Sequence, residues 1–143
     1  MTTSKRTNVP RMSVEARIRA SIRRAKCKVF LRKDFAKFGT YRQVGRALQA
    51  LLKDGVLVRI GYGVYAKARP SSLSGNPVPQ GTLMEIGLEA MSKLGIKADI
   101  GQAARDYRDG RSTQIPMAAV LSVGKARVTR KIGFGKRFLM YER

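Results

Sequence analysis

Histidine and tryptophan are absent from this 143-residue chain, and Cys27 is its single cysteine. The lack of histidine excludes a histidine-dependent catalytic triad. One cysteine without histidine also excludes a Cys/His zinc site and an intrachain disulfide. We interpret Cys27 as a packing thiol at the end of a helix. We therefore expect a protein that is not an enzyme and that needs no cofactor or metal.

Long apolar runs are also missing. No stretch approaches the roughly 20 apolar residues that span a bilayer. The N-terminal stretch carries charges but lacks the apolar core of a secretory signal. We expect a cytoplasmic protein with no membrane partner.

Acidic residues are scarce, since 9 Asp and Glu stand against 30 Lys and Arg and give a formal net charge of +21. A surplus of this size makes a polyanion the natural partner. DNA, RNA and an anionic membrane surface are the candidates, and charge is all that supports the last. Residues 1–69 hold 18 basic and 3 acidic residues, against 12 and 6 in residues 70–143. The first half is therefore predicted to carry more of the contact with the polyanion.

The best-marked element is a helix that begins after Thr40. Thr40 and Gln43 have the spacing of a capping box. Gly55 stands where a left-handed C-terminal cap is needed. Between them the apolar residues recur at helical spacing and predict one buried face: Val44, Ala47, Leu48, Leu51 and Leu52.

Other elements surround this helix. A first helix is predicted from Ser13 to about Lys26, a strand at 29–31 and a short helix at 33–38, with Gly39 as the turn. Two β-rich runs at 56–60 and 64–67 flank Gly61-Tyr62-Gly63 and predict a hairpin. This order predicts a winged helix-turn-helix over residues 13–69. The alternative is a helix and a hairpin that only build a core.

The polar face of the helix that begins after Thr40, here called the central helix, predicts contacts with duplex DNA. Four side chains are expected to reach base edges in the major groove: Arg42, Gln43, Arg46 and Gln49. Six more are expected to hold phosphates: Thr40, Tyr41, Lys53, Arg59, Tyr62 and Lys67. The missing side chain of Gly45 is expected to let the helix backbone approach the DNA.

The rest of the chain predicts three further parts. Residues 1–12 are polar and basic and predict a flexible arm. Residues 70–81 have the composition of a linker, and residues 82–143 predict a small α+β C-terminal domain with a helix from Thr82 to about Leu94. Antiparallel strands are expected at 117–123, 126–132 and 137–141. The whole chain is therefore assigned to the α+β class.

Two weaker patterns have simpler interpretations. The triplets at 61–63 and 133–135 have the form G-x-G without the third glycine of a dinucleotide site, and we interpret them as hairpin turns. Asp106 and Asp109 lie near three arginines. Ion pairing is the simpler interpretation of that cluster, and a carboxylate-based nuclease centre is the alternative.

The stretches at 30–35, 44–48 and 52–67 resemble the winged-helix domain of the AbiEi-type antitoxins, most closely their short DUF6088-like relatives. The most specific part is Asp54-Gly55-Val56-Leu57 followed by Gly63-Val64-Tyr65-Ala66. Residues 103–107 and 111–116 are also similar to segments of those relatives. The resemblance implies binding to operator DNA and repression of a toxin–antitoxin operon. It also implies that the rest of the chain counteracts a nucleotidyltransferase-like toxin without forming a stable complex.

The sequence therefore predicts a sequence-specific double-stranded DNA-binding protein, acting as a transcriptional repressor of the type IV antitoxin kind. Its expected partners are duplex DNA and a second copy of itself, and the sequence identifies no toxin. One alternative is an antitoxin or interaction protein that acts on a protein partner. Another is an RNA- or ribosome-associated protein, because a charge of +21 suits any polyanion. The helix and hairpin argue against RNA, whose sequence-specific readers use exposed aromatic platforms.

Overall fold

The computed structural model of the protein describes residues 12–143. The predicted basic arm falls on residues 1–12 and, except for Met12, lies outside the described residues. The described chain is mixed α+β, with five helices and mainly antiparallel sheets. Its first half contains α2 (Val14–Arg24), β1 (Val29–Leu31), the 3-10 helix η1 (Arg32–Phe38), α3 (Tyr41–Lys53), β2 (Leu57–Gly61) and β3 (Val64–Pro70).

The strands of the first half form one sheet around β3. Strands β1 and β2 both pair antiparallel with β3, in the order β1-β3-β2. The predicted strand at 29–31 is thus confirmed, and it pairs with the hairpin as expected. The hairpin turn contains Gly63, whose φ of 67° lies in the left-handed region that favours glycine.

Local signals fix both ends of α3. The backbone N–H of Gln43 donates to Thr40 Oγ1 (3.1 Å), and the backbone N–H of Thr40 donates to Gln43 Oε1 (2.9 Å). This pair is the predicted capping box. Gly55, with a φ of 74°, follows the C-cap residue Asp54. Four of the five residues predicted for the buried face of α3 are buried, namely Val44, Ala47, Leu48 and Leu51. Leu52 is only half-buried.

The segment 70–81, predicted as a linker, carries strand β4 (Pro77–Pro79). This strand pairs antiparallel with the end of β3, with Ala68 opposite Pro79. Its prolines cannot donate to a further neighbour, which is why such a segment is found at the edge of a sheet. Gln80 extends the connection, because its side-chain amide donates to the carbonyl of Ala68 (3.0 Å).

The second half contains α4 (Leu83–Lys93), β5 (Asp99–Ile100), α5 (Gln102–Arg108), β6 (Val120–Ser122), β7 (Gly133–Phe134), β8 (Arg137–Phe138) and β9 (Met140–Glu142). Thr82 caps α4, since its Oγ1 accepts from the backbone N–H of Glu85 (3.1 Å). Strands β5, β6 and β9 form one small sheet, and β7 and β8 form a two-stranded hairpin.

The strands predicted in the second half need correction. β6 and β9 pair in parallel, not antiparallel, because the chain makes an excursion through β7 and β8 before returning beside β6. The predicted strand at 137–141 is divided at the buried Leu139 into β8 and β9. The run 126–132 forms no strand. Its alternation reflects one-sided burial of Val128 and Ile132 against the core. The carbonyl of Ile132 accepts from the backbone N–H of Leu139 (2.8 Å), but no strand forms over the run.

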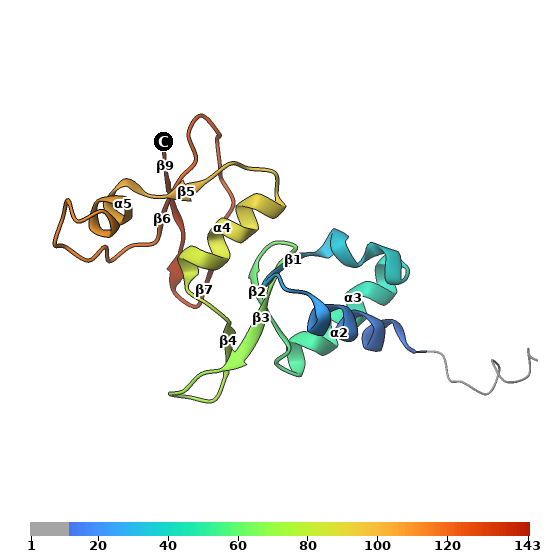
Figure 1. Cartoon of the computed structure of the whole chain (residues 1–143). Helices are drawn as coiled ribbons and strands as arrows, with labels where there is room; N and C mark the ends of the chain where they lie inside the picture. The colour runs from blue at the N-terminus through green and yellow to red at the C-terminus, as the bar shows by residue number, and fades with distance from the viewer. Residues whose placement is uncertain (1–11) are drawn as a thin grey trace, which may run out of the picture.

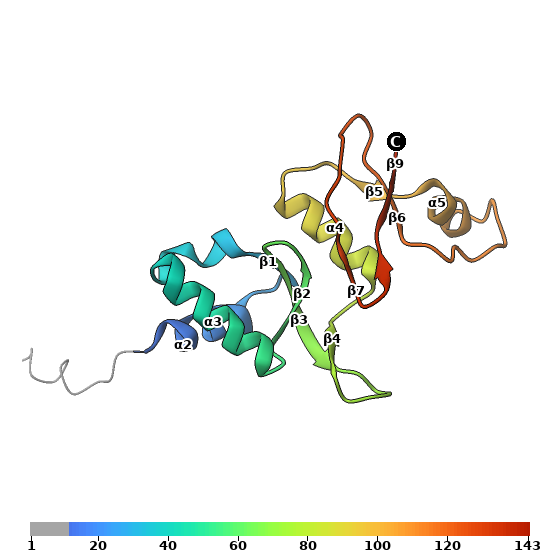
Figure 2. The same ribbon diagram turned by 180° about the vertical axis from the view of Figure 1, so that it is seen from behind.

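The first sheet is a layer buried on both faces. Side chains alternate along each strand, so Phe30, Leu57 and Tyr65 pack with α2, η1 and α3, while neighbouring residues pack on the opposite face with α4 and the second half. Figures 1 and 2 show α2 and α3 on one side of this sheet and α4 on the other. One of the two core clusters therefore draws on both halves of the chain.

Helix α4 is also tied to the first half by polar groups. The carboxylate of Glu89 accepts from the backbone N–H groups of Lys28 (2.6 Å) and Val29 (3.2 Å) at the start of β1. Lys93 Nζ lies 3.0 Å from Asp34 Oδ2 on η1. Burial lowers the pKa of Lys93, but the hydrogen bond and charge of Asp34 outweigh it, and the net pKa is raised.

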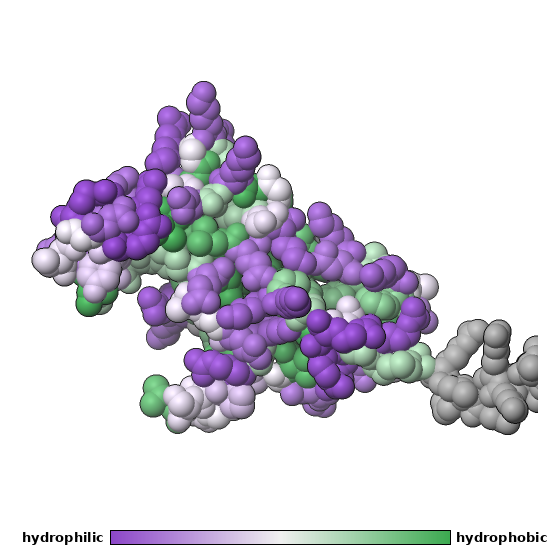
Figure 3. Space-filling model, in the orientation of Figure 1, coloured by the Kyte–Doolittle hydropathy of each residue, from purple (hydrophilic) through white to green (hydrophobic). Residues whose placement is uncertain are grey.

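Polar side chains cover most of the face seen in Figure 3, and the largest apolar area on it lies between α4 and α5. Among the residues described, no helix is both long and apolar enough to cross a bilayer.

Candidate nucleic-acid interface

A groove of about 710 Å³ lies between the start of α3, helix η1 and the β2–β3 hairpin. Its floor is apolar and includes Leu31, Val44 and Val64. Eight polar or aromatic residues line it: Arg32, Lys33, Tyr41, Gln49, Arg59, Tyr62, Tyr65 and Arg130. Four of these, Tyr41, Gln49, Arg59 and Tyr62, are among the predicted DNA contacts. The groove thus brings the helix and the hairpin together.

The outer face of α3 presents four predicted contacts. Arg42, Arg46, Gln49 and Lys53 are all exposed. Their spacing of four, three and four residues places them along one side of the helix. Within the described residues none of these four side chains forms a hydrogen bond or an ion pair with the protein. They are available to an external partner.

Gln43 has a different place. Its side-chain oxygen is held by the backbone N–H of Thr40 in the capping box. A bidentate contact with adenine needs both the amide oxygen and the amide nitrogen. The structure therefore gives Gln43 and Thr40 a role in capping the N-terminus of α3, which competes with the predicted DNA contacts of both residues.

Tyr41 begins α3 and is 79% exposed. The guanidinium of Arg32 lies 3.9 Å from its ring centroid, and Arg32 Nη2 donates to the Tyr41 carbonyl (2.7 Å). A Cβ on Gly45 would lie 3.1 Å from the same Nη2. The missing side chain of Gly45 thus makes room for Arg32, and the close approach of the helix backbone to DNA stays a prediction.

The hairpin contributes Arg59 and Tyr62. Both residues are exposed, and Tyr62 is 82% exposed at the tip. The guanidinium of Arg59 lies 5.9 Å from that ring, and its Nε donates to the carbonyl of Gly61 (3.4 Å). A cation and an aromatic ring therefore stand together at the hairpin edge of the groove.

Lys67 lies apart from the other predicted contacts. Its Nζ donates to the carbonyl of Ala25, just after the end of α2, and the side chain is half-buried. The positive charge there meets a helix C-terminus, where a cation is favourable. Its observed role is to join α2 to β3.

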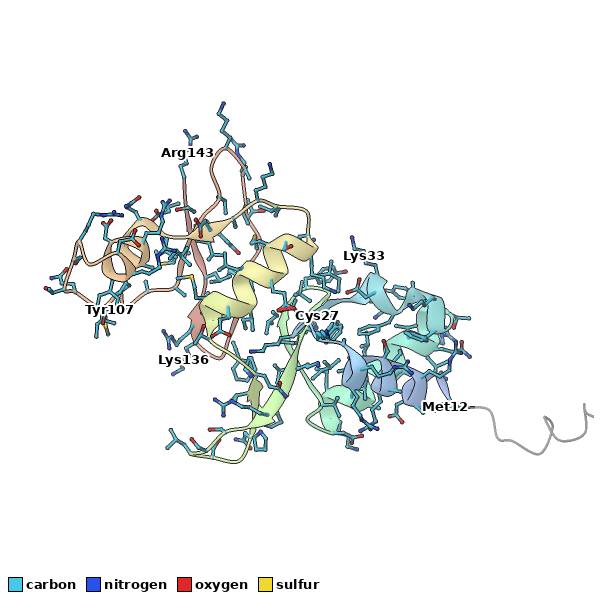
Figure 4. All side chains as sticks on the ribbon, viewed as in Figure 1. Met12, Cys27, Lys33, Tyr107, Lys136 and Arg143 are labelled. Atoms are coloured by element: carbon cyan, nitrogen blue, oxygen red, sulfur yellow. The ribbon has the colours of Figure 1, made fainter. Side chains whose placement is uncertain are left out.

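Sequence reasoning missed three basic residues of the groove, Arg32, Lys33 and Arg130. Figure 4 shows Lys33 on η1, at the upper edge of the first half. Arg32 and Lys33 begin η1, the helix that comes just before α3 in the chain. Their closeness in sequence to the start of α3 was a usable signal. Arg130 gave no such signal, because its position depends on contacts between distant parts of the chain.

Every one of the nine carboxylates is engaged inside the protein. Five pair with basic side chains within 3.5 Å: Asp34, Asp54, Glu85, Asp106 and Asp109. Glu15 lies 4.0 Å from Arg19, and the remaining three accept backbone hydrogen bonds: Glu89, Asp99 and Glu142. None of them lines the groove. Its potential is therefore set by arginine and lysine alone.

The acidic cluster on α5 forms ion pairs, in line with the simpler of the two interpretations. Asp106 accepts from Gln102 (2.8 Å) and Arg111 (3.1 Å), which together lower the pKa of Asp106. Arg108 lowers the pKa of Asp109 in the same way. No set of three metal-binding side chains converges within residues 12–143. The cluster therefore serves to hold α5 and the segment after it.

Comparison with known proteins gives one match. The model of the DUF6088 family, a family of unknown function, matches residues 17–143. The chain belongs to the DUF6088 family. The match covers both halves, so the DUF6088 unit includes the groove, α4 and the small second sheet. Neither the curated proteins nor the solved structures compared with this DUF6088 chain gave a match.

Proposed function

We propose that residues 14–70 form a winged helix-turn-helix and that the protein binds double-stranded DNA sequence-specifically, as a transcriptional repressor. The order of elements supports this assignment, since a helix, a strand, two helices and a hairpin follow one another and β1 lies beside β3. In this proposal α3 is the recognition helix and the β2–β3 hairpin is the wing. The protein acts by binding and not as an enzyme.

One observation carries the proposal. Gln49, on the free side of α3, and Tyr62, at the tip of the hairpin, line the same groove, and no carboxylate lines that groove. Arg42, Arg46 and Lys53 are exposed on the same side of α3 as Gln49. Arg46 and Gln49 would read guanine and adenine edges from the major groove. Arg42, Lys53 and Arg59 would contact phosphates and supply the salt-dependent part of the affinity.

RNA is the second candidate, and a specific observation favours it. Tyr41 and Tyr62 are 79% and 82% exposed on the two sides of the groove. Exposed aromatic rings stack on unpaired bases in many RNA-binding proteins. Against this, the guanidinium of Arg32 already covers the ring of Tyr41 at 3.9 Å. Duplex DNA therefore remains the preferred partner.

Selection of random duplex fragments by the purified full-length protein tests the proposal. We expect a defined motif to be enriched and structured RNA to compete poorly for it. If about six phosphates are contacted, log K should fall against log salt with a slope near −5. A flat salt dependence, or RNA that displaces the selected duplex at equal phosphate concentration, would contradict the proposal.

A further inference from the structure

The connection from β6 to β7 is strongly basic and has no role in the core sheets. Residues 124–131, here called the basic segment, contain Lys125, Arg127, Arg130 and Lys131. All four are exposed, and none has a carboxylate partner among the described residues. No acidic residue occurs anywhere from 110 to 141. Such a segment has no partner of opposite charge within its own fold.

The basic segment is anchored to the tip of the hairpin. Arg130 Nη1 donates to the carbonyl of Tyr62 (3.3 Å), and the Tyr141 hydroxyl donates to the carbonyl of Arg130 (2.9 Å). The carbonyl of Lys131 lies 3.0 Å from where a Cβ on Gly61 would stand. Just beyond the segment, Ile132 is fully buried. These contacts fix the segment against β2 and the turn at 62–63.

The basic segment also lies on the face that carries α3. In Figure 2 the chain leading to β7 passes in front of α4, and α3 lies in front of α2; both orders are reversed in Figure 1. Arg130 lines the same groove as Tyr41 and Gln49 of α3. A duplex laid across α3 and the hairpin would continue along the basic segment.

We propose that the basic segment is a third DNA-contacting element, in which Arg127 and Lys131 contact phosphates of the duplex held by α3 and the hairpin. Arg130 positions the segment through its bond to the hairpin tip. The proposal rests on the proposed DNA binding. It places part of the interface in the second half of the chain, although the charge distribution predicts that the first half carries more of the contact.

The test uses the full-length protein and the duplex selected above. The double substitution Arg127→Gln/Lys131→Gln removes two charges from side chains that form no bond within the described fold. Each phosphate contact contributes about 0.9 to the slope of log K against log salt. The slope should therefore flatten by about two units, which corresponds to roughly 60-fold weaker binding at 0.1 M salt.

The matched control is Lys136→Gln/Arg137→Gln, which removes two charges from the β7–β8 turn. Figure 4 shows Lys136 below β7, at the opposite end of the second half from the turn that follows β6. This control should keep the parent slope. The charge-conserving variant Arg127→Lys/Lys131→Arg should keep it as well, because phosphate contacts depend on charge.

The outcomes separate the two proposals. A parent protein that does not bind duplex DNA overturns both. A parent that binds, with the Gln double variant matching the control, overturns the role of the basic segment alone. Equal loss in the charge-conserving variant would also overturn it, since that loss would come from side-chain shape.

Discussion

At the scale of single residues, the fold itself uses part of the polar face that the sequence assigns to DNA. Gln43 closes a capping box and Lys67 ties β3 to the end of α2. Arg46, one turn into α3, is exposed and forms no bond within the described residues. The capping role of Gln43 could be read locally, from its distance to Thr40. The partner of Lys67 is a carbonyl 42 residues away, so no local pattern could reveal it.

Substitutions at Arg46 and Gln43 are therefore expected to have opposite effects on stability and on DNA binding. Arg46→Ala should change the free energy of unfolding by less than about 0.5 kcal/mol, because it removes no internal contact. Binding to the selected duplex should lose roughly 1–3 kcal/mol, with relaxed preference at one base. Gln43→Ala should instead cost about 0.5–1 kcal/mol of stability and leave base preference intact. Urea unfolding and anisotropy titrations measure both quantities.

The Gln43→Ala and Arg46→Ala variants could also contradict the roles proposed for these two residues. Should Gln43→Ala fold with parental stability yet lose base preference, Gln43 would read bases despite its capping bond. Should Arg46→Ala keep both the affinity and the preference of the parent, α3 would not be the recognition helix.

At the scale of elements, α4 packs on the first sheet and stabilises the first half of the chain. It covers the sheet face opposite α2 and α3, and Glu89 receives the first amides of β1. Its glycine is part of this packing, because a Cβ on Gly87 would lie 2.5 Å from Leu139 Cδ1. The sequence predicts close packing at Gly87 but not the partner, which follows in the chain by some fifty residues.

Gly87→Ala tests that packing. Alanine gains about 1 kcal/mol of helix propensity, but Leu139 is only 6% exposed and has little room to move. Overpacking of this kind costs typically 1–3 kcal/mol, so a net loss of about 1 kcal/mol is expected from thermal and urea unfolding. Adding Leu139→Ala should make the Gly87→Ala step favourable. A stabilising Gly87→Ala in the parent background would contradict the close contact.

The Lys93–Asp34 pair predicts a pH dependence. Because the pKa of Lys93 is raised in the folded protein, its contribution is fully present below the unfolded pKa of about 10.4 and is lost as pH rises through the folded value. The difference in unfolding free energy between the parent and Lys93→Met should be constant from pH 7 to 9 and shrink above pH 10. Lys97→Met, at an exposed position without a carboxylate partner in the described chain, is the control. A difference that grows above pH 10 would contradict the ion pair.

Prediction from sequence was accurate for elements whose ends are set by neighbouring residues. It failed for strands whose pairing depends on distant parts of the chain. The bounds of α3 follow from Thr40 and Gly55, which act within one turn of the helix ends. The strands of the second half are two or three residues long, and their pairing depends on which segments meet in space. The parallel pairing of β6 with β9, and the absence of a strand over 126–132, could not be predicted from the alternation of apolar and polar residues. Alternation indicates only which side of a segment is buried.

At the scale of the whole molecule, the first sheet is shared. One face of this sheet is covered by α2, η1 and α3, and the other face is covered by the second half of the chain. Six strand residues of the first half belong to the cluster shared with the second half: Val29, Leu31, Val58, Ile60, Val64 and Ala66. The groove walls depend on the same arrangement, because Arg130 closes one of them.

A fragment of residues 1–81 should therefore not fold cooperatively, although it contains every element from α2 to β4. Exposing a Val, Leu or Ile side chain costs about 1.5–3 kcal/mol. The five such residues among the six together approach the whole stability of a typical domain. Far-ultraviolet circular dichroism during heating is expected to show a broad, non-cooperative loss of signal. A sharp transition in the fragment would mean that the first half folds alone.

All nine Asp and Glu side chains form contacts within the protein, so the chain should tolerate substitutions at acidic positions less well than at exposed basic positions. Replacing an exposed arginine or lysine removes one of thirty charges and often no internal bond. Replacing Asp34 or Glu89 removes an internal bond and also increases the repulsion of an already highly cationic chain. In a deep mutational scan selected for abundance, neutral substitutions should therefore be depleted at acidic positions and largely retained at exposed basic ones.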